Sequence, residues 1–267
     1  MGLRSNIVRA IMSMVGPSRG FGIAGGVRRK SLTSQLSRFT NNKVQTGPFQ
    51  GMVLPDITSW GDGDRAPKLL GTYEADLFPA IADLVARAPQ QVINVGCAEG
   101  YYAVGLARLL PTAAILAFDI DIAAQRLCAT AAALNGNNVQ VSGLCTPATL
   151  NGLLNSTIPT LIVMDCEGGE AELLDPIAVP GLANADILVE SHDCITPGLK
   201  EDLAARFAPT HTVELIRQGP RNPHALNLFP GLTERDRWLM VDENRPEPMY
   251  WLVCRADRQS AHCQSAE

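Results

Sequence analysis

From residue 91 onward, short apolar runs alternate with segments whose apolar residues recur at helical spacing. The runs, such as TLIVMD and ADILVE, are almost continuously apolar, as expected of parallel strands that are covered on both faces. Regular alternation of strand and helix predicts a doubly wound α/β sheet. The expected strands are 91–95, 113–119, 138–144, 160–165 and 185–191, and the expected helices are 101–110, 122–134, 147–154, 168–174 and 197–207.

The two ends of the chain follow different patterns. After a helical pattern over Tyr73 to Ala88, the late strands 211–218 and 249–255 enclose only a short helix, which predicts an antiparallel pair at one sheet edge. Residues 1–45 are rich in Gly, Ser and Arg, lack sustained periodicity and are expected to be largely disordered. We therefore expect a basic leader over 1–45, a folded domain over 46–256 and a polar tail over 257–267.

A glycine-rich turn, Gly96-Cys97-Ala98-Glu99-Gly100, separates the first strand from a helix that begins at Tyr101. Such a turn lets the backbone approach a nucleotide-like ligand. The dinucleotide fingerprint G-x-G-x-x-G requires glycine where this chain has Tyr101, whereas the spacing G-x-A-x-G is closer to the S-adenosylmethionine (SAM) loop of class I methyltransferases. Asp119, at the end of the second strand, is placed to accept from ribose hydroxyls. The alternatives are a nicotinamide or flavin cofactor, and a tight turn without a ligand.

Acidic residues and a histidine follow the fourth and fifth expected strands. In open α/β sheets the ligand lies at the carboxyl ends of the strands, so Asp165, Glu167, Glu190 and His192 are expected on one rim. A histidine near a carboxylate has suitable basicity to deprotonate a hydroxyl group. Asp165, Glu190 and His192 also offer donors for a divalent metal, a weaker alternative because no D-D or D-N pair marks it.

Five segments together resemble the FkbM-type class I SAM-dependent methyltransferases. The most specific is the D-x-E-G-x-E signature after the fourth strand, here Asp165 to Glu170, while Asn94 and Ala98 depart from the residues that many class I enzymes have. The resemblance implies a Rossmann-like, seven-stranded, mostly parallel sheet with an antiparallel closing strand. It also implies O-methylation of a hydroxyl on a glycan, glycolipid or glycosylated metabolite. The segments are LLGTYEADL (69–77), INVGCAEGYYAVGLA (93–107), AFDID (117–121), LIVMDCEGGEAELL (161–174) and ILVESHD (187–193).

These patterns assign roles to individual residues. His192, Glu167 and Asp165 are the expected catalytic residues, and no metal is expected, with Asp165, Glu190 and His192 as the alternative metal set. Asp121 is expected to cap the following helix. Residues 219–231 are expected to form a substrate lid. The expected cofactor-binding residues are Tyr73, Glu74, Asn94, Gly96, Cys97, Ala98, Gly100, Asp119, Ile120, Leu144 and Asp165.

Composition narrows the class of partner. The net charge is −5, but eight basic residues and no acid precede Asp56, so the basic arm stands apart from an acidic body. We interpret the arm as a mobile leader that keeps its charge in water, with weak contact to a membrane surface as the alternative. The acidic body and the lack of an N/D-P-P-Y/F motif argue against a nucleic-acid partner, and no apolar run is long enough for a transmembrane segment. Seven cysteines without a CxxC pair indicate a reducing, cytoplasmic location. Two rival functions stay open: a nicotinamide-dependent oxidoreductase and a non-catalytic SAM-fold scaffold.

Overall fold

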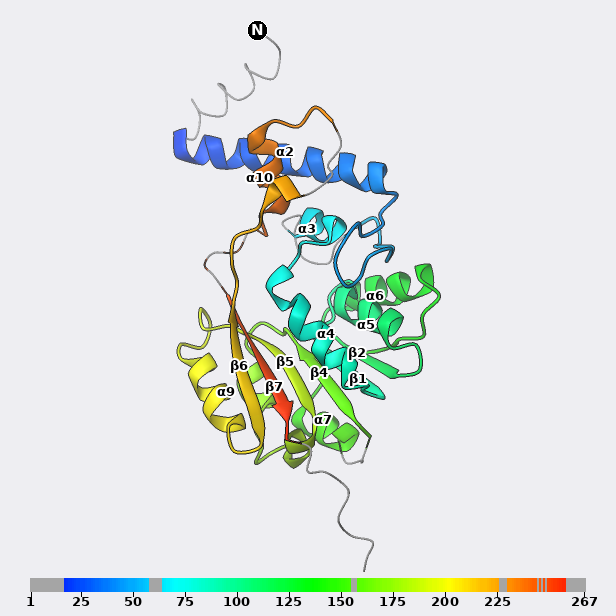
Figure 1. The fold of residues 1–267 in the computed structure, drawn as a ribbon, viewed down its shortest axis with the longest axis vertical. Coiled ribbons are helices and arrows are strands. Elements are labelled where there is room, and N and C mark those ends of the chain that lie inside the picture. Colours follow the sequence, from blue (N-terminus) through cyan, green and yellow to red (C-terminus); the bar gives the residue numbers. More distant parts are fainter. Residues whose placement is uncertain are drawn as a thin grey trace, which may run out of the picture.

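The computed structural model describes residues 17–57, 64–154, 158–225, 230–243, 245, 247 and 249–257, without the side chains of 17–24 and 225. A seven-stranded sheet with the order β3-β2-β1-β4-β5-β7-β6 forms its centre (Figure 1). The first five strands are parallel, and β7 is antiparallel to both β5 and β6. This arrangement confirms the expected fold class. The strands are β1 (Gln91–Val95), β2 (Ala114–Phe118), β3 (Gln140–Ser142), β4 (Thr160–Met164), β5 (Asp186–Ser191), β6 (His211–Arg217) and β7 (Tyr250–Ala256).

The central strands are buried on both faces, which explains their continuous apolar sequence. In β1, Val92 belongs to one hydrophobic core and Ile93 to the other, and β4 divides in the same way between Leu161 and Ile162. The first core is covered by α4 (Phe78–Ala86), α5 (Tyr101–Leu109) and α6 (Ile122–Leu134). The second is covered by α7 (Pro147–Leu154), α8 (Glu170–Leu173), the 3₁₀ helix η2 (Pro180–Asn184) and α9 (Leu199–Phe207).

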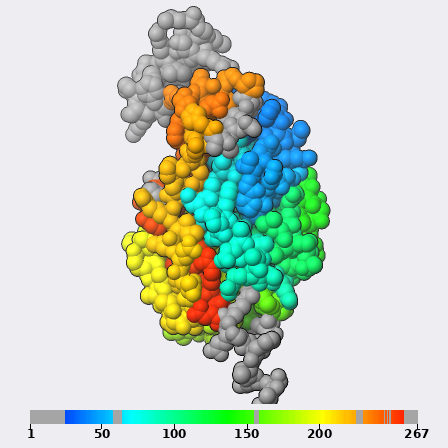
Figure 2. Space-filling view, in the orientation of Figure 1, coloured from blue at the N-terminus to red at the C-terminus, as the bar shows by residue number. Residues whose placement is uncertain are grey.

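The prediction of a disordered leader is wrong for the part of it that the structure describes. Residues Pro17–Thr40 form helix α2, which packs on α3 (Arg65–Leu70) and α10 (Glu234–Val241). Leu32 and Leu36 are buried, and the Arg28 guanidinium donates to both carboxylate oxygens of Asp236 at 2.7 Å. In Figure 2 the blue surface of this helix adjoins the cyan surface of the segment before β1. Tertiary contacts of this kind stabilise a helix whose own periodicity is weak. Residues 1–16 lie outside the described part of the chain.

Two further segments differ from expectation. Tyr73 to Ala88 is not one helix, because Glu74 adopts a left-handed conformation with φ of +48° and a 3₁₀ turn, η1 (Ala75–Leu77), comes before α4. A second 3₁₀ turn, η3 (Pro223–Ala225), lies within the expected lid, of which 226–229 are outside the described residues. Of the expected tail, only Asp257 is described. Among the described helices, none combines the length and the apolar character that crossing a membrane requires.

Candidate active site

A cavity of about 470 Å³ opens at the carboxyl ends of β1 to β5. Its volume lies within the range of small-molecule binding sites. The β1–α5 turn forms one wall, and the segments after β2, β3, β4 and β5 form the others. The lining residues are Asp64, Lys68, Tyr73, Val95, Gly96, Ala98, Glu99, Phe118, Asp119, Ile120, Gly143, Leu144, Cys145, Asp165, Cys166, Glu167, Gly169, Leu173, Glu190 and Arg245.

Left-handed backbone conformations shape the β1–α5 turn. The φ angles are +77° at Gly96, +46° at Ala98 and +91° at Gly100. A Cβ atom added to Gly96 would lie 1.7 Å from the carbonyl oxygen of Asp165, so the ends of β1 and β4 can approach this closely only with glycine there. The turn therefore leaves its backbone facing the cavity.

Asp119 supports this turn from the end of β2. Its Oδ2 accepts from the Ala98 N–H and its Oδ1 from the Asp121 N–H, both at 2.9 Å. Asp121 in turn accepts from the Ala123 N–H at 2.8 Å, which confirms its expected role as the N-cap of α6. Asp119 lines the cavity and at the same time stabilises the left-handed Ala98.

Exposed aliphatic side chains form the edge of the cavity near β2 and β3. Ile120 is 78% exposed and Leu144 is 67% exposed, and both line the cavity. Phe118 and Cys145 line the wall beside them. This edge therefore offers an apolar surface to a flat ring.

A buried carboxylate orients His192 at the opposite end. Glu170 Oε1 lies 2.8 Å from His192 Nδ1, and the carboxylate also accepts from the backbone N–H groups of Cys166 and Gly168 at 3.1 and 2.8 Å. Burial tends to raise the pKa of Glu170, but its hydrogen bond to His192 and the charge of that residue outweigh this and lower the pKa. A carboxylate that stays ionised here favours a proton on Nδ1 of the imidazole.

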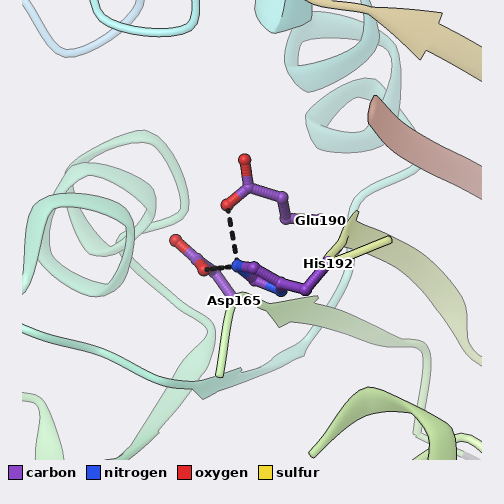
Figure 3. Close-up of side chains that lie close together, drawn as sticks. All are labelled: Asp165, Glu190 and His192. Atoms are coloured by element: carbon purple, nitrogen blue, oxygen red, sulfur yellow. Dashed lines mark ion pairs between the residues drawn. The ribbon is translucent and has the colours of Figure 1, made fainter. Parts of the chain in front are cut away.

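The other ring nitrogen of His192 faces three more carboxylates. Nε2 lies 3.3 Å from Glu167 Oε2 and 3.5 Å from both Asp165 Oδ1 and Glu190 Oε2 (Figure 3 draws the last two). Burial tends to lower the pKa of His192, but the bond to Glu170 and the surrounding negative charges raise it. Burial, and then the charge of Asp165, raise the pKa of Glu190 well above its usual value. The cluster thus concentrates acidic groups around one imidazole.

Two cations lie in the cavity wall. The Arg245 guanidinium makes close ion pairs with Glu74 and Glu190 and donates to the Tyr73 hydroxyl at 3.2 Å. Lys68 Nζ lies 2.6 Å from Glu99 and 4.7 Å from the centre of the Tyr73 ring. Burial, only partly offset by Arg245, raises the pKa of Glu74 to about 7. Together these contacts anchor the residues before β1 to the rim.

The expected site residues fall into two groups. Eight of them line the cavity: Tyr73, Gly96, Ala98, Asp119, Ile120, Leu144, Asp165 and Glu167. The other five lie behind its wall. Glu74 pairs with Arg245 and Tyr102, Asn94 donates to the Val163 carbonyl oxygen, Cys97 is buried, Gly100 begins α5, and His192 lies beneath the carboxylates. The binding and catalytic roles of all thirteen stay predictions.

Sequence reasoning missed Lys68, Glu99, Glu170 and Arg245. Only Glu170 carried a signal, because it is the last residue of the D-x-E-G-x-E signature. Lys68 and Arg245 lie in segments without a recognisable motif.

A second cavity, of about 710 Å³, lies between the end of β6 and α10, and Arg245 lines both cavities. Arg221 contributes Nη1 to Asp76 at 2.6 Å and Nε to Glu243 at 2.9 Å. Its Nη2 is buried and has no hydrogen-bond partner in the described structure. Trp238 is 49% exposed at the same cavity. The second cavity thus joins an aromatic face to an unused guanidinium donor, next to the rim.

Comparisons with known proteins return structures but no families. No family model matches the chain, and no curated protein matches it. The O-methyltransferase TomG from Streptomyces achromogenes, solved in complex with SAM, is 13% identical, with 71% of this chain and 83% of that chain covered and a TM-score of 0.47. The O-methyltransferase from Bacillus cereus in complex with SAH is 11% identical, with coverage of 94% and 97% and a TM-score of 0.46. Cofactor-bound Rv0187 from MTB is 12% identical, with coverage of 96% and 99% and a TM-score of 0.45. Similarity at this level does not decide the activity of this chain.

Proposed function

We propose that this protein is a SAM-dependent O-methyltransferase of the FkbM type, acting on a hydroxyl of a glycan, glycolipid or glycosylated metabolite. The observation that carries the proposal is the Gly96–Gly100 turn, held by Asp119 over a cavity with an apolar edge and an acidic end. A sulfonium nucleoside fits a site that combines these three features. The resemblance at the D-x-E-G-x-E signature supports the subfamily.

Each part of the cavity suits one part of the cofactor. Asp119 is placed to accept hydrogen bonds from the ribose hydroxyls. Ile120 and Leu144 are placed to pack against the adenine ring. The backbone of the turn borders the middle of the cavity. Asp165 places a carboxylate at the end where a sulfonium would lie, which favours a cationic ligand.

Catalysis in this proposal depends on position and on removal of one proton. When bound, SAM supplies a methyl group on a sulfonium, which an oxygen nucleophile displaces in line. An alcohol is a poor nucleophile, so a base must take its proton. Glu167 lines the cavity and its carboxylate lies 3.3 Å from His192 Nε2, so this pair receives the hydroxyl proton while Glu170 holds the ring in place.

The second cavity is the proposed acceptor site. Arg245 lines both cavities, so an acceptor bound there would be separated from the rim by this side chain. Trp238 offers an apolar face of the kind that packs against a sugar ring, and a small movement of Arg221 would bring its unpartnered Nη2 to an acceptor oxygen.

Binding and turnover test the proposal separately. Asp119→Ala leaves the backbone N–H groups of Ala98 and Asp121 without their acceptor and removes the ribose contact, at a cost of about 1–3 kcal/mol. We therefore expect S-adenosylhomocysteine to bind about 5- to 150-fold more weakly. His192→Ala should keep this binding and slow transfer of labelled methyl to acceptor hydroxyls.

The outcomes separate the rival functions. Binding of a nicotinamide cofactor in place of S-adenosylhomocysteine would favour the oxidoreductase. S-adenosylhomocysteine binding without turnover over a broad acceptor panel would favour the scaffold. Full activity in both variants would refute the site assignment.

A further inference from the structure

Three different donor groups meet at the acidic end of the cofactor cavity. Asp165 follows β4, and Glu190 and His192 lie at the end of β5; one donor atom from each lies within 4.8 Å of the other two (Figure 3). Glu190 and His192 are 1% and 2% exposed, so this is not a solvated acidic surface. Two carboxylate oxygens and an imidazole nitrogen are donors that first-row divalent cations accept.

The support behind His192 is a second, independent observation. Glu170 is completely buried, is held by two backbone N–H groups, and contacts Nδ1 rather than Nε2. A carboxylate on the far ring nitrogen sets the tautomer and leaves the Nε2 lone pair free, as in the outer shell of many metal-bound histidines. Here Nε2 faces three carboxylates at 3.3–3.5 Å. Arg245 pairs with one of them, Glu190, and a cation next to Nε2 would balance the negative charge of the others.

We propose that Asp165, Glu190 and His192 bind a divalent cation, with Glu167 beside it on the cavity side. The oxygen-rich set with a single imidazole suits Mn²⁺ or Mg²⁺ better than a thiophilic metal. Asp165, Glu167 and Glu190 all line the cofactor cavity, so an oxygen of the acceptor can reach the ion from that side. Arg245 pairs with Glu190 on its other oxygen, Oε1, which leaves Oε2 for the ion.

The role of the ion rests on the proposed methyltransferase function. A cation bound to the acceptor oxygen lowers the pKa of that hydroxyl. The proton passes to Glu167, the oxygen forms its bond to the methyl carbon, and the carbon–sulfur bond breaks with its electron pair on sulfur, leaving a neutral thioether. His192 is then a ligand, and Glu167 alone receives the proton.

The test is Mn²⁺ binding to the full chain after treatment with a chelator, followed by electron paramagnetic resonance and by calorimetry. We expect one saturable site. Asp165→Asn and His192→Gln should each weaken it at least tenfold. Glu214→Gln, which removes an exposed carboxylate on β6 that pairs with Arg255, should leave it unchanged. Lower pH should weaken binding, since protons compete for the ligands.

Glu170 acts as a positioning residue and needs its own readout. Glu170→Gln should lower Mn²⁺ affinity by about 10- to 100-fold. The ¹⁵N chemical shifts of the His192 ring should at the same time show loss of the Nδ1–H tautomer, which a general loss of stability would not produce. Circular dichroism checks that each variant is folded. If Glu170→Gln does not fold, the Mn²⁺ affinity of His192→Gln tests the site instead.

S-adenosylhomocysteine binding to the same samples separates the two proposals. Bound S-adenosylhomocysteine without any saturable Mn²⁺ or Mg²⁺ site would overturn the metal proposal and leave the proposed function intact. A saturable metal site without S-adenosylhomocysteine binding would support the metal site but overturn its proposed role in methyl transfer. Mn²⁺ binding that Asp165→Asn and His192→Gln leave unchanged would place the ion elsewhere and overturn the assignment.

Discussion

Gly96→Ala tests the contact on which the geometry of the cavity depends. The added Cβ would lie 1.7 Å from the Asp165 carbonyl oxygen and 2.6 Å from its carbon, both backbone atoms that cannot rotate away. The ends of β1 and β4 must therefore separate. This separation weakens or breaks the hydrogen bond of 3.0 Å from the Asp165 N–H to the Val95 carbonyl oxygen. Such a bond contributes about 1 kcal/mol to stability. A left-handed φ of +77° adds about 1–2 kcal/mol for a residue with a side chain.

Gly136→Ala is the matched control. Gly136 has a similar φ of +66°, but a Cβ there meets nothing within 4 Å. Both substitutions restrict the unfolded chain equally, so this effect cancels in the comparison. By urea unfolding we expect Gly96→Ala to lose at least about 1 kcal/mol more stability than Gly136→Ala, the value of the hydrogen bond alone.

Calorimetry with S-adenosylhomocysteine completes the comparison. Gly96→Ala moves both the turn and Asp165, so we expect clearly weaker binding, whereas Gly136→Ala should bind as the wild type does. Equal stability and equal affinity in the two variants would refute the reasoning from close approach.

Two further substitutions test the buried charges. Lys68→Met removes the cation that pairs with both Asp64 and Glu99, which is 2% exposed, and should cost about 3–5 kcal/mol in urea unfolding; the double variant with Glu99→Gln should recover part of the loss. The hydrogen bond to Arg28 lowers the pKa of Asp236 below its usual 3.8, so the stability from this pair is present above pH 3.8 and is lost as the pH falls through the lowered pKa. Asp236→Asn should thus lower the unfolding free energy by about 1 kcal/mol relative to wild type, and this difference should stay constant from neutral pH to about pH 4 and shrink below it. A difference that already shrinks between pH 7 and 5 would contradict this assignment.

Local patterns predicted the sheet and much of the cavity. The strands were recognisable because burial on both faces demands continuous apolar runs, and α6 because Asp121 caps it directly after β2. The turn was recognisable because left-handed conformations at Gly96 and Gly100 favour glycine. In each case the physical cause lies within a few residues of the signal.

Contacts between segments that are distant in the sequence could not be predicted from local patterns. Arg245 meets Glu74 across 171 positions, and Arg28 meets Asp236 across 208, so neither pair leaves a local pattern. Helix α2 was missed for the same reason, since its stabilising partners α3 and α10 lie outside the local sequence, α10 almost at the other end of the chain. The sequence placed His192 and its acidic neighbours on one rim, but which ring nitrogen faces them depends on the packing of Glu170.

Titration of the purified chain with S-adenosylhomocysteine is the most direct test of the central claim, that the hollow beside the β1–α5 turn binds a sulfonium nucleoside. We predict saturable heat at one site per chain, competed by SAM and not by NAD(H), and weakened by Asp119→Ala. A titration without binding heat, or an unchanged affinity in the Asp119→Ala protein, would contradict this claim.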